Sequence, residues 1–191
     1  NPGIRMRRGL TLFIVSTALM AAVPFVADNY VVRLCTFLCM YSALALSWNL
    51  IGGYAGYPSF STAGFFGLGA YAGALLQNNG VAPVWSWLAA PIVVAVFAAS
   101  LGRAILKMKG HYFAIGSLAI GEVLRLVASS WASLTGGGDG LNVPIVQGGP
   151  DFIGRVFLYS MMAMMVVSFV VTIVVDRKRL GFGLRCIKHD E

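Results

Sequence analysis

Six long apolar runs constrain the fold of this chain more than any other feature. The runs cover residues 10–27, 31–51, 60–76, 84–106, 112–131 and 156–175. A helix that crosses the roughly 30 Å hydrocarbon core of a bilayer needs about 20 residues, within a range of about 17–25, and every run meets that length. Backbone polar groups in lipid must be paired within the chain, which favours helices. None of the runs shows the alternation of a membrane barrel strand.

The composition supports this interpretation. Hydrophobic residues make up 58% of the 191-residue chain and charged residues only 11%, whereas a soluble domain averages about 25% charged residues. So little polar surface cannot cover a globule in water. The sequence therefore predicts an all-α, polytopic membrane helix bundle with six transmembrane spans, forming one domain over residues 1–191. The opening run lacks a small-residue cleavage site, so it is expected to be a retained helix.

The distribution of positive charge predicts the orientation. When the six spans alternate from a cytoplasmic N-terminus, eleven Lys and Arg residues fall on the cytoplasmic side and two, Arg33 and Arg155, fall outside. Cytoplasmic loops carry such an excess. Dispersal along several loops also argues against a nucleic-acid interface. The eleven cytoplasmic residues are Arg5, Arg7, Arg8, Arg103, Lys107, Lys109, Arg177, Lys178, Arg179, Arg185 and Lys188.

The motifs of enzymes are missing from the sequence. It contains no phosphate-binding G-x-x-x-x-G-K-[ST] loop and no paired carboxylates at catalytic spacing. Cys35 and Cys39 lie in an apolar run and are expected to be buried hydrophobes. His111 and His189 have no further ligands at metal-binding spacing. We therefore expect no enzymatic activity, no metal and no cofactor on this chain, and a partner or an ion gradient must power any pumping.

The glycine-rich stretch "NLIGGYAGYPSFSTAGFFGLGAYAGALL", residues 49–76, is the most unusual part of the sequence. Pro58 and the hydroxyl residues that follow it predict a break in the helix. Broken backbone survives at membrane depth only when protein covers it or it lines a cavity, and transporters place such breaks at substrate sites. The alternative is that the glycines only tighten packing, since Gly52/Gly56 and Gly69/Gly73 have small-xxx-small spacing.

Two charged residues lie inside the 112–131 run. Glu122 and Arg125 are three residues apart, so they share a helical face, and pairing lowers the cost of burying either charge in a bilayer. We expect the pair to point inward, either along a substrate path or as a buried pair that fixes helix register or contacts a neighbouring subunit. The candidate residues of a substrate path are Asn49, Gly52, Gly53, Gly56, Ser59, Ser61, Thr62, Gly67, Glu122 and Arg125.

Residues 133–154 form the longest predicted connection, on the external side. Their glycines and prolines exclude a long regular helix, and long ordered loops are often functional. The alternative is a flexible connector, which would be an unusual place for Leu141, Val143, Ile145 and Val146.

Three stretches resemble one known family. "SWNLIGGYAGYPSFSTAGFFGLGAYAGALL", "KGHYFAIGSLAIGEVLRLVASSW" followed by "LTGGGDGLNVP", and "DRKRLGFGLRCIKHDE" resemble, in order, signatures of the LivM-like permease subunits of ATP-binding-cassette (ABC) importers for branched-chain amino acids. The resemblance runs from about residue 35 to 191. Family members carry a Gly-His pair in the first signature, and the matching positions here are Ser61 and Thr62, so substrate specificity is expected to differ if that histidine matters.

The resemblance implies partners as well as a function. It implies alternating access in the bacterial inner membrane, together with a second, LivH-like permease subunit, two ATPase subunits that bind ATP, and an extracytoplasmic substrate-binding protein. The implied loop facing the binding protein contains Gly136, Gly137, Gly138, Asp139, Gly140 and Asn142. The implied ATPase-coupling residues are Arg179, Gly181, Gly183, Arg185, Lys188, Asp190 and Glu191. It also implies that the chain is truncated before the family's last spans.

Three alternatives remain open from the residues themselves. The basic tail is equally consistent with a juxtamembrane segment on anionic headgroups. A stand-alone channel or facilitator for a small polar solute could be built on the broken glycine-rich stretch, and a membrane scaffold needs no transport at all. Within the family, permeases for urea and short amides are similar and compete on substrate.

Overall fold

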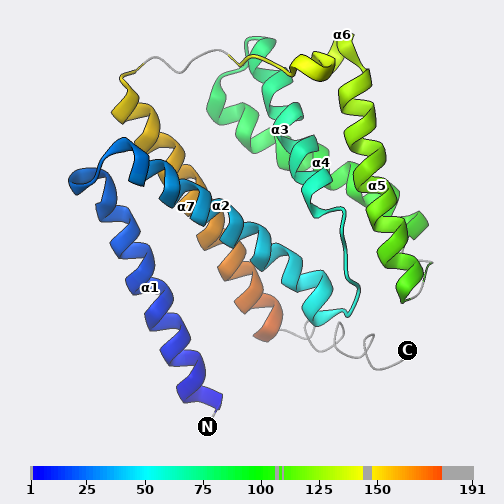
Figure 1. The fold of residues 1–191 in the computed structure, drawn as a ribbon. Helices are drawn as coiled ribbons and strands as arrows, with labels where there is room; N and C mark the ends of the chain where they lie inside the picture. The colour runs from blue at the N-terminus through cyan, green and yellow to red at the C-terminus, as the bar shows by residue number, and fades with distance from the viewer. Residues whose placement is uncertain (1, 106–107, 109, 144–147, 178–191) are drawn as a thin grey trace. The chain divides into compact units, whose positions relative to one another are not determined.

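The computed structural model describes residues 2–105, 108, 110–143 and 148–177, which contain helices and no strand. Figure 1 shows the fold. In chain order the elements are α1 (Pro2–Val26), α2 (Asn29–Trp48), the π-helical turn η1 (Asn49–Tyr54), α3 (Thr62–Asn78), α4 (Pro83–Ile105), α5 (His111–Ser130), α6 (Ala132–Thr135), the 3₁₀ turn η2 (Gly137–Asp139) and α7 (Pro150–Arg177). The all-α prediction is therefore confirmed for the described part of the chain.

Five helices in the described ranges, rather than six, are long and apolar enough to cross a membrane. They are α1, α2 continued through η1, α4, α5 and α7. The sixth predicted span, 60–76, corresponds to α3, which has 17 residues and so a length of only about 25 Å. Residues 60 and 61, at the start of the predicted span, belong to the helix break before α3 and are not helical.

Two helices begin earlier than their apolar runs. α1 begins at Pro2, before the predicted start at residue 10, because the basic opening residues continue the helix. α7 begins at Pro150, before the predicted start at 156. Proline suits the first turn of a helix and an acidic residue such as Asp151 is favourable there. The predicted 22-residue external connection therefore ends with the first turn of α7.

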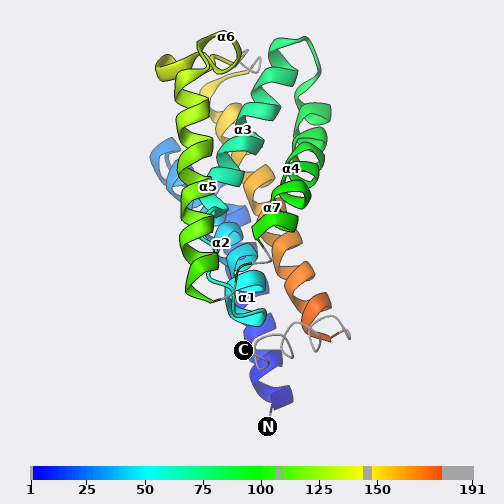
Figure 2. The same ribbon diagram turned by 90° about the vertical axis from the view of Figure 1, so that its right-hand side faces the viewer.

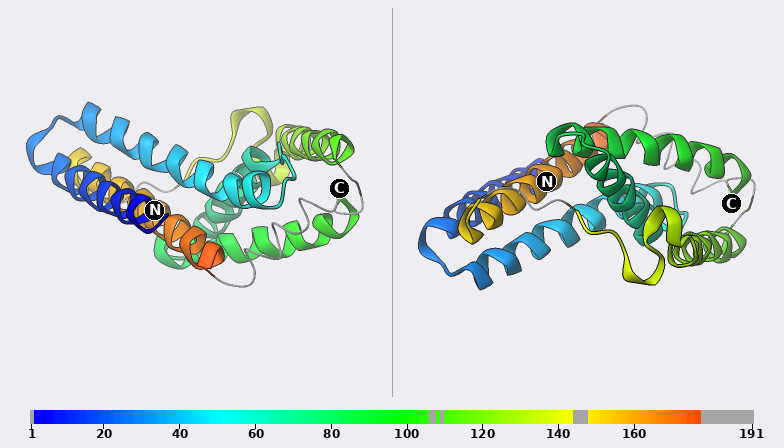
Figure 3. Two further views of the ribbon diagram at one scale, coloured as in Figure 1. Left: turned by 90° about the horizontal axis from the view of Figure 1, so that it is seen from below. Right: turned by 90° about the horizontal axis from the view of Figure 1, so that it is seen from above.

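The described chain divides into two compact units. The first contains α1, α2 as far as Ser47, and α7; the second runs from Trp48 to η2. In the first unit, α1 and α2 are joined by a short turn, and α7 lies beside both of them (Figure 3). The second unit places α3 between α4 and α5 (Figure 2).

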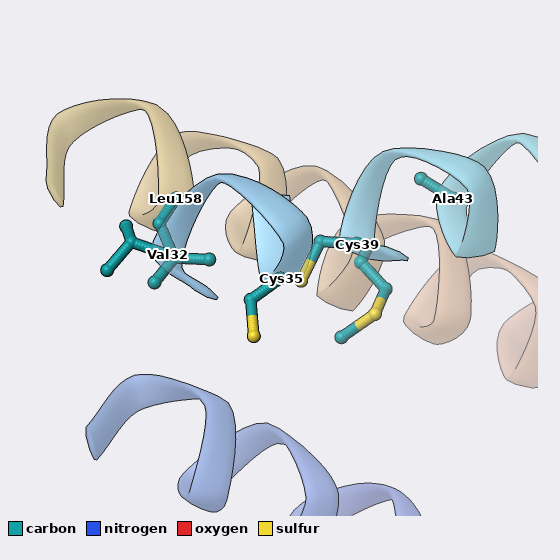
Figure 4. Close-up of a cluster of buried hydrophobic side chains, with 6 residues drawn as sticks. Val32, Cys35, Cys39, Ala43 and Leu158 are labelled. Carbon is teal, nitrogen blue, oxygen red and sulfur yellow. The ribbon is translucent and has the colours of Figure 1, made fainter. Parts of the chain in front are cut away.

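The core of the first unit is a stripe along α2 packed against α7. Val32, Cys35, Cys39 and Ala43 recur at helical spacing, and Leu158 of α7 meets them (Figure 4). Cys39 and Leu158 are fully buried. The two cysteines are buried, as predicted, and are free thiols, and the Cys39 Sγ lies 3.6 Å from the Met20 Sδ of α1.

A hydrogen bond and a cation–π contact join the helices at one end of the first unit. The Asn29 side chain at the start of α2 donates to the Asp151 carboxylate at the start of α7 over 2.6 Å. A hollow of about 190 Å³ lies at this end, between the α1–α2 turn and the first turns of α7. The Arg155 guanidinium lies 5.5 Å from the centre of the Phe25 ring. These contacts join all three helices of the unit.

Small residues bring α3 and α4 together in the second unit. A Cβ placed on Gly73 would lie 3.8 Å from the Ala90 Cβ, and one on Gly69 would lie 3.4 Å from a Val94 methyl. The Gly69/Gly73 spacing therefore serves close helix packing, as expected. The Gly52/Gly56 pair does not, because Gly56 lies beyond η1 in the left-handed region, with φ +80°.

Candidate functional site

The glycine-rich stretch is broken where the sequence predicted. η1 ends at Tyr54, residues 55–61 are not helical, and α3 begins at Thr62. We call residues 55–61 the broken segment. Gly56 supplies the turn with its positive φ, which other residues rarely adopt. Pro58, which lacks an N–H, lies in its middle.

The broken segment runs alongside the first half of α5. The Tyr57 ring meets the Phe113 ring edge-on at 4.9 Å. Farther on, the Phe60 N–H donates to the Ser117 hydroxyl over 2.9 Å, and a Cβ on Gly64 would lie 3.0 Å from the Gly121 Cα. Residues 57–64 therefore run alongside residues 113–121 of α5 in the same direction.

These contacts set the depth of the break. α5 is a candidate span, His111–Ser130. With a rise of about 1.5 Å per residue, Phe113 lies about 3 Å and Gly121 about 15 Å from its start. The broken segment therefore occupies membrane depth, where its backbone needs partners within the protein.

Three buried hydroxyls lie at this contact, and that of Ser117 pairs with the backbone of the broken segment. Ser59, Ser61 and Ser117 are 6%, 3% and 1% exposed. The Ser59 and Ser61 hydroxyls lie 3.0 Å apart. The Ser117 hydroxyl accepts the Phe60 N–H and donates to the Ala114 carbonyl over 2.8 Å. The serines thus form a polar strip between the broken segment and α5.

The opposite face of the broken segment is open. Phe60, between the two buried serines, is 57% exposed, and Gly56 is exposed too. Burial thus alternates along Ser59, Phe60 and Ser61, although Ser61 already has helical dihedrals, with φ −81° and ψ −2°. One face therefore packs on α5 while the other presents a large aromatic ring.

A compact turn covers the end of α5. The Thr135 hydroxyl of α6 bonds the carbonyls of Ala128 and Trp131, at 2.5 and 2.7 Å. Gly136 and Gly137 have φ +73° and +60° and so allow the chain to reverse into η2. The first part of the connection between α5 and α7 is therefore built from two short helical turns, α6 and η2.

Comparison with known proteins decides the family. The family model described as "Branched-chain amino acid transport system / permease component" matches residues 30–191. The chain belongs to this family.

Two curated relatives carry the same description, "High-affinity branched-chain amino acid transport system permease protein LivM". The protein from Escherichia coli (strain K12) is 33% identical over 135 residues, and that from Salmonella typhimurium (strain LT2) is 32% identical over 135 residues. Each match covers 69% of this chain and 31% of the relative. The chain thus spans about a third of the length of these relatives. No solved structure matches it. Together, the family and the candidate spans make it a multi-pass membrane protein of the transport-permease class.

The predicted site residues of this permease chain divide into three groups. Ser59, Ser61 and Gly56 come together in the broken segment, with Thr62 as the first residue of α3. Asn49, Gly52 and Gly53 lie in η1, where the Asn49 side chain occupies the space a Cβ on Gly53 would need. Gly67 lies on α3 with no neighbour within 4 Å of a Cβ placed on it, so it makes no close helix contact.

Glu122 and Arg125 form the predicted pair but do not point inward. The Arg125 Nε lies 2.9 Å and its Nη2 2.5 Å from the Glu122 carboxylate oxygens. Their side chains are 52% and 65% exposed. The expectation of a pair buried within this chain is therefore wrong. Gly121 faces the broken segment, and Glu122, the next residue on the helix, points about 100° away from it.

The structure describes the residues of the implied binding-protein loop but not those of the implied ATPase-coupling segment. Gly136, Gly137, Gly138, Asp139 and Gly140 form the turn over α5, and Asn142 follows it. All of the ATPase-coupling candidates, 179–191, lie outside the described residues, although the family match includes them.

Sequence reasoning missed two residues of the site, Ser117 and Trp48. Ser117 looked like an ordinary residue of an apolar helix, and only its position opposite Phe60 reveals its role. Trp48 donates its indole N–H to the Ser59 carbonyl over 2.7 Å. The spacing of Ser117 and Gly121 in "GSLAIGE" could have predicted a close contact of α5, because small residues four positions apart mark close helix packing in membranes.

Proposed function

We propose that this chain is a membrane-spanning permease subunit of an ABC importer that moves branched-chain or related hydrophobic amino acids by alternating access. Its family membership supports transport. The description of the LivM relatives supports the substrate class.

The observation that carries the proposal is the open face of the broken segment. Its backbone is not helical, it lies at the depth of α5, and Phe60 on its outer face is 57% exposed. Irregular backbone cannot face hydrocarbon because its polar groups would be unpaired. The open face must therefore adjoin other protein or a water-filled cavity, and transporters build substrate sites at such breaks.

In this proposal the two halves of an amino acid meet different groups. The apolar side chain would pack on the exposed ring of Phe60. The carboxylate would approach the start of α3, because the first N–H groups of a helix have no partner within it and carry partial positive charge. Ser59, Ser61 and Ser117 would hold the broken segment on α5 rather than contact the substrate.

The exposed ion pair supports a partner subunit. Glu122 and Arg125 lie in a candidate span yet are more than half exposed. Charges facing lipid at that depth are costly. We place this face of α5 against the second, LivH-like permease subunit or the aqueous path between the two subunits.

Energy would come from two ATPase subunits, with no cofactor on this chain. Residues 181–191 would dock on them, with Arg179 at the start of the docking segment, and an extracytoplasmic binding protein would deliver substrate to the turn over α5. The charge distribution supports a bacterial inner-membrane location with the N-terminus in the cytoplasm.

Reconstituted transport tests the proposal. The full-length protein that carries this sequence, with all its subunits in proteoliposomes, is expected to take up radiolabelled leucine only when the ATPases can hydrolyse ATP. Equal uptake without ATP, or from the permease alone, would refute the importer and favour a channel. Competition by urea but not by valine or isoleucine would refute the substrate class.

A further inference from the structure

The indole of Trp48 joins the two ends of the helix break. Trp48 is the last residue of α2, and its Nε1–H donates to the Ser59 carbonyl, eleven residues on, over 2.7 Å. The ring lies directly on η1, because a Cβ on Gly52 would come within 2.7–2.9 Å of three of its carbons. One side chain thus contacts both η1 and the broken segment.

Two polar groups depend on this contact. A carbonyl at membrane depth without a donor costs several kcal/mol, and the indole N–H needs an acceptor as well. The Tyr57 N–H bonds the Ile51 carbonyl over 3.2 Å, which closes the same stretch from inside. π-Helical turns such as η1 are rare and occur mostly at functional sites.

Together with the bond from the Phe60 N–H to Ser117, the contact also sets which face of the broken segment is open. Ser59 is 6% exposed while the next residue, Phe60, is 57% exposed. A hydrogen bond to the Ser59 carbonyl fixes the peptide plane between these residues, since that carbonyl belongs to it. Rotation of this plane would change the direction of the Phe60 side chain and of the serines.

We propose that Trp48 is a positioning residue of the substrate path: lying on Gly52 and bonding the Ser59 carbonyl, its indole holds the broken segment against α5. This inference rests on the proposed function, in which the open face of that segment borders the path. Without the indole bond, Ser61 becomes accessible to water more often and Phe60 leaves its position for part of the time.

Thiol labelling tests the contact itself. In the full-length protein assembled with its subunits, Ser61→Cys places a thiol at a position that is 3% exposed. Adding Trp48→Phe, which keeps a ring but removes the N–H, is expected to raise the rate of modification by a small methanethiosulfonate about fivefold, the effect of losing one net hydrogen bond. The signal of the same proteins without Ser61→Cys is subtracted. Trp85→Phe, an exposed tryptophan of α4, is the matched control and is expected to change nothing.

Transport kinetics test the role in the path. Trp48→Phe with native Ser61 is expected to raise KM for leucine about threefold to tenfold, with uptake still dependent on ATP. A labelling rate unchanged by Trp48→Phe overturns the inference whatever the uptake. Faster labelling with an unchanged KM overturns the positioning role but leaves the importer proposal intact. The importer proposal fails instead if uptake by the wild-type protein needs no ATP.

A second variant tests the inference if the Trp48→Phe protein is not stable in the membrane. Should Trp48→Phe fail to accumulate in the membrane, Gly52→Ala displaces the ring while keeping the N–H, because its Cβ would overlap the indole. It is expected to raise labelling of Ser61→Cys and KM in the same direction. Gly9→Ala in α1, where a Cβ meets nothing within 4 Å, is the matched glycine control. Equal behaviour of Gly52→Ala and Gly9→Ala would overturn the inference.

Discussion

The two units bury different kinds of side chain. Among the described residues, the first unit buries only apolar side chains, with Val32, Cys39 and Leu158 in one cluster, whereas every buried polar side chain lies in the second. Those polar residues are Ser59, Ser61, Ser86, Ser117 and Thr135. Regular helices satisfy their own backbone and need only shape at their contacts. A broken helix also needs partners for its freed backbone groups, and Ser59, Ser61 and Ser117 are buried at the broken segment.

This difference makes the first unit a packing element and the second the candidate for transport. Three substitutions, each with a matched control, test this division of roles.

Leu158→Ala tests the apolar core of the first unit. Its side chain is fully buried against α2, so the substitution is expected to lower the free energy of unfolding by about 3 kcal/mol through lost contacts and a cavity. Unfolding in mixed detergent and SDS micelles measures this. The exposed Val167→Ala of the same helix is the control. KM for uptake should stay unchanged, and a raised KM would contradict the division of roles.

Gly64→Ala tests the crossing of α3 and α5. The new Cβ would lie 3.0 Å from the Gly121 Cα, a backbone atom that cannot rotate away. Overpacking of this kind is expected to cost about 2 kcal/mol, with a lower maximal uptake rate. Gly9→Ala in α1, where a Cβ meets nothing within 4 Å, serves as control. Wild-type stability and uptake in Gly64→Ala would show that the two helices do not need this close approach.

Ser117→Ala tests the hydroxyl pairing. The Phe60 N–H would lose its acceptor, at an expected cost of about 1 kcal/mol in unfolding. KM should rise more than that loss of stability explains, because the broken segment is released locally. Ser100→Ala, whose hydroxyl bonds the Val96 carbonyl of its own helix, is the control. Identical KM values for the two variants would separate the serine strip from transport.

The sequence was sufficient for the helices and for the break. Apolar length alone located the long helices, and Pro58 among glycines and hydroxyl residues located the interruption. The helix ends were harder to predict from the sequence, since Pro2 and Pro150 begin helices outside the apolar runs. Hydropathy reports where lipid begins, whereas capping and proline geometry decide where a helix begins.

The contacts within the site could not be predicted from spacing. Ser117 and Trp48 act on residues 57 and 11 positions away in sequence, and no local pattern encodes such pairings. Glu122 and Arg125 show the opposite limit. Their spacing predicted the ion pair, but the direction in which the pair faces depends on helix rotation, which is set by the position of Gly121 against the broken segment.

The Gly64–Gly121 crossing has a mechanical consequence. Where helices interlock through large side chains, any tilt must first pull each one out of its neighbour's groove and through an unfavourable rotamer. At this crossing a Cβ on Gly64 would meet the Gly121 Cα first and a Leu124 methyl next, at 3.3 Å. Because Leu124 supplies the one side chain among these nearest atoms, α3 can tilt over α5 there with few changes of rotamer, as at a pivot.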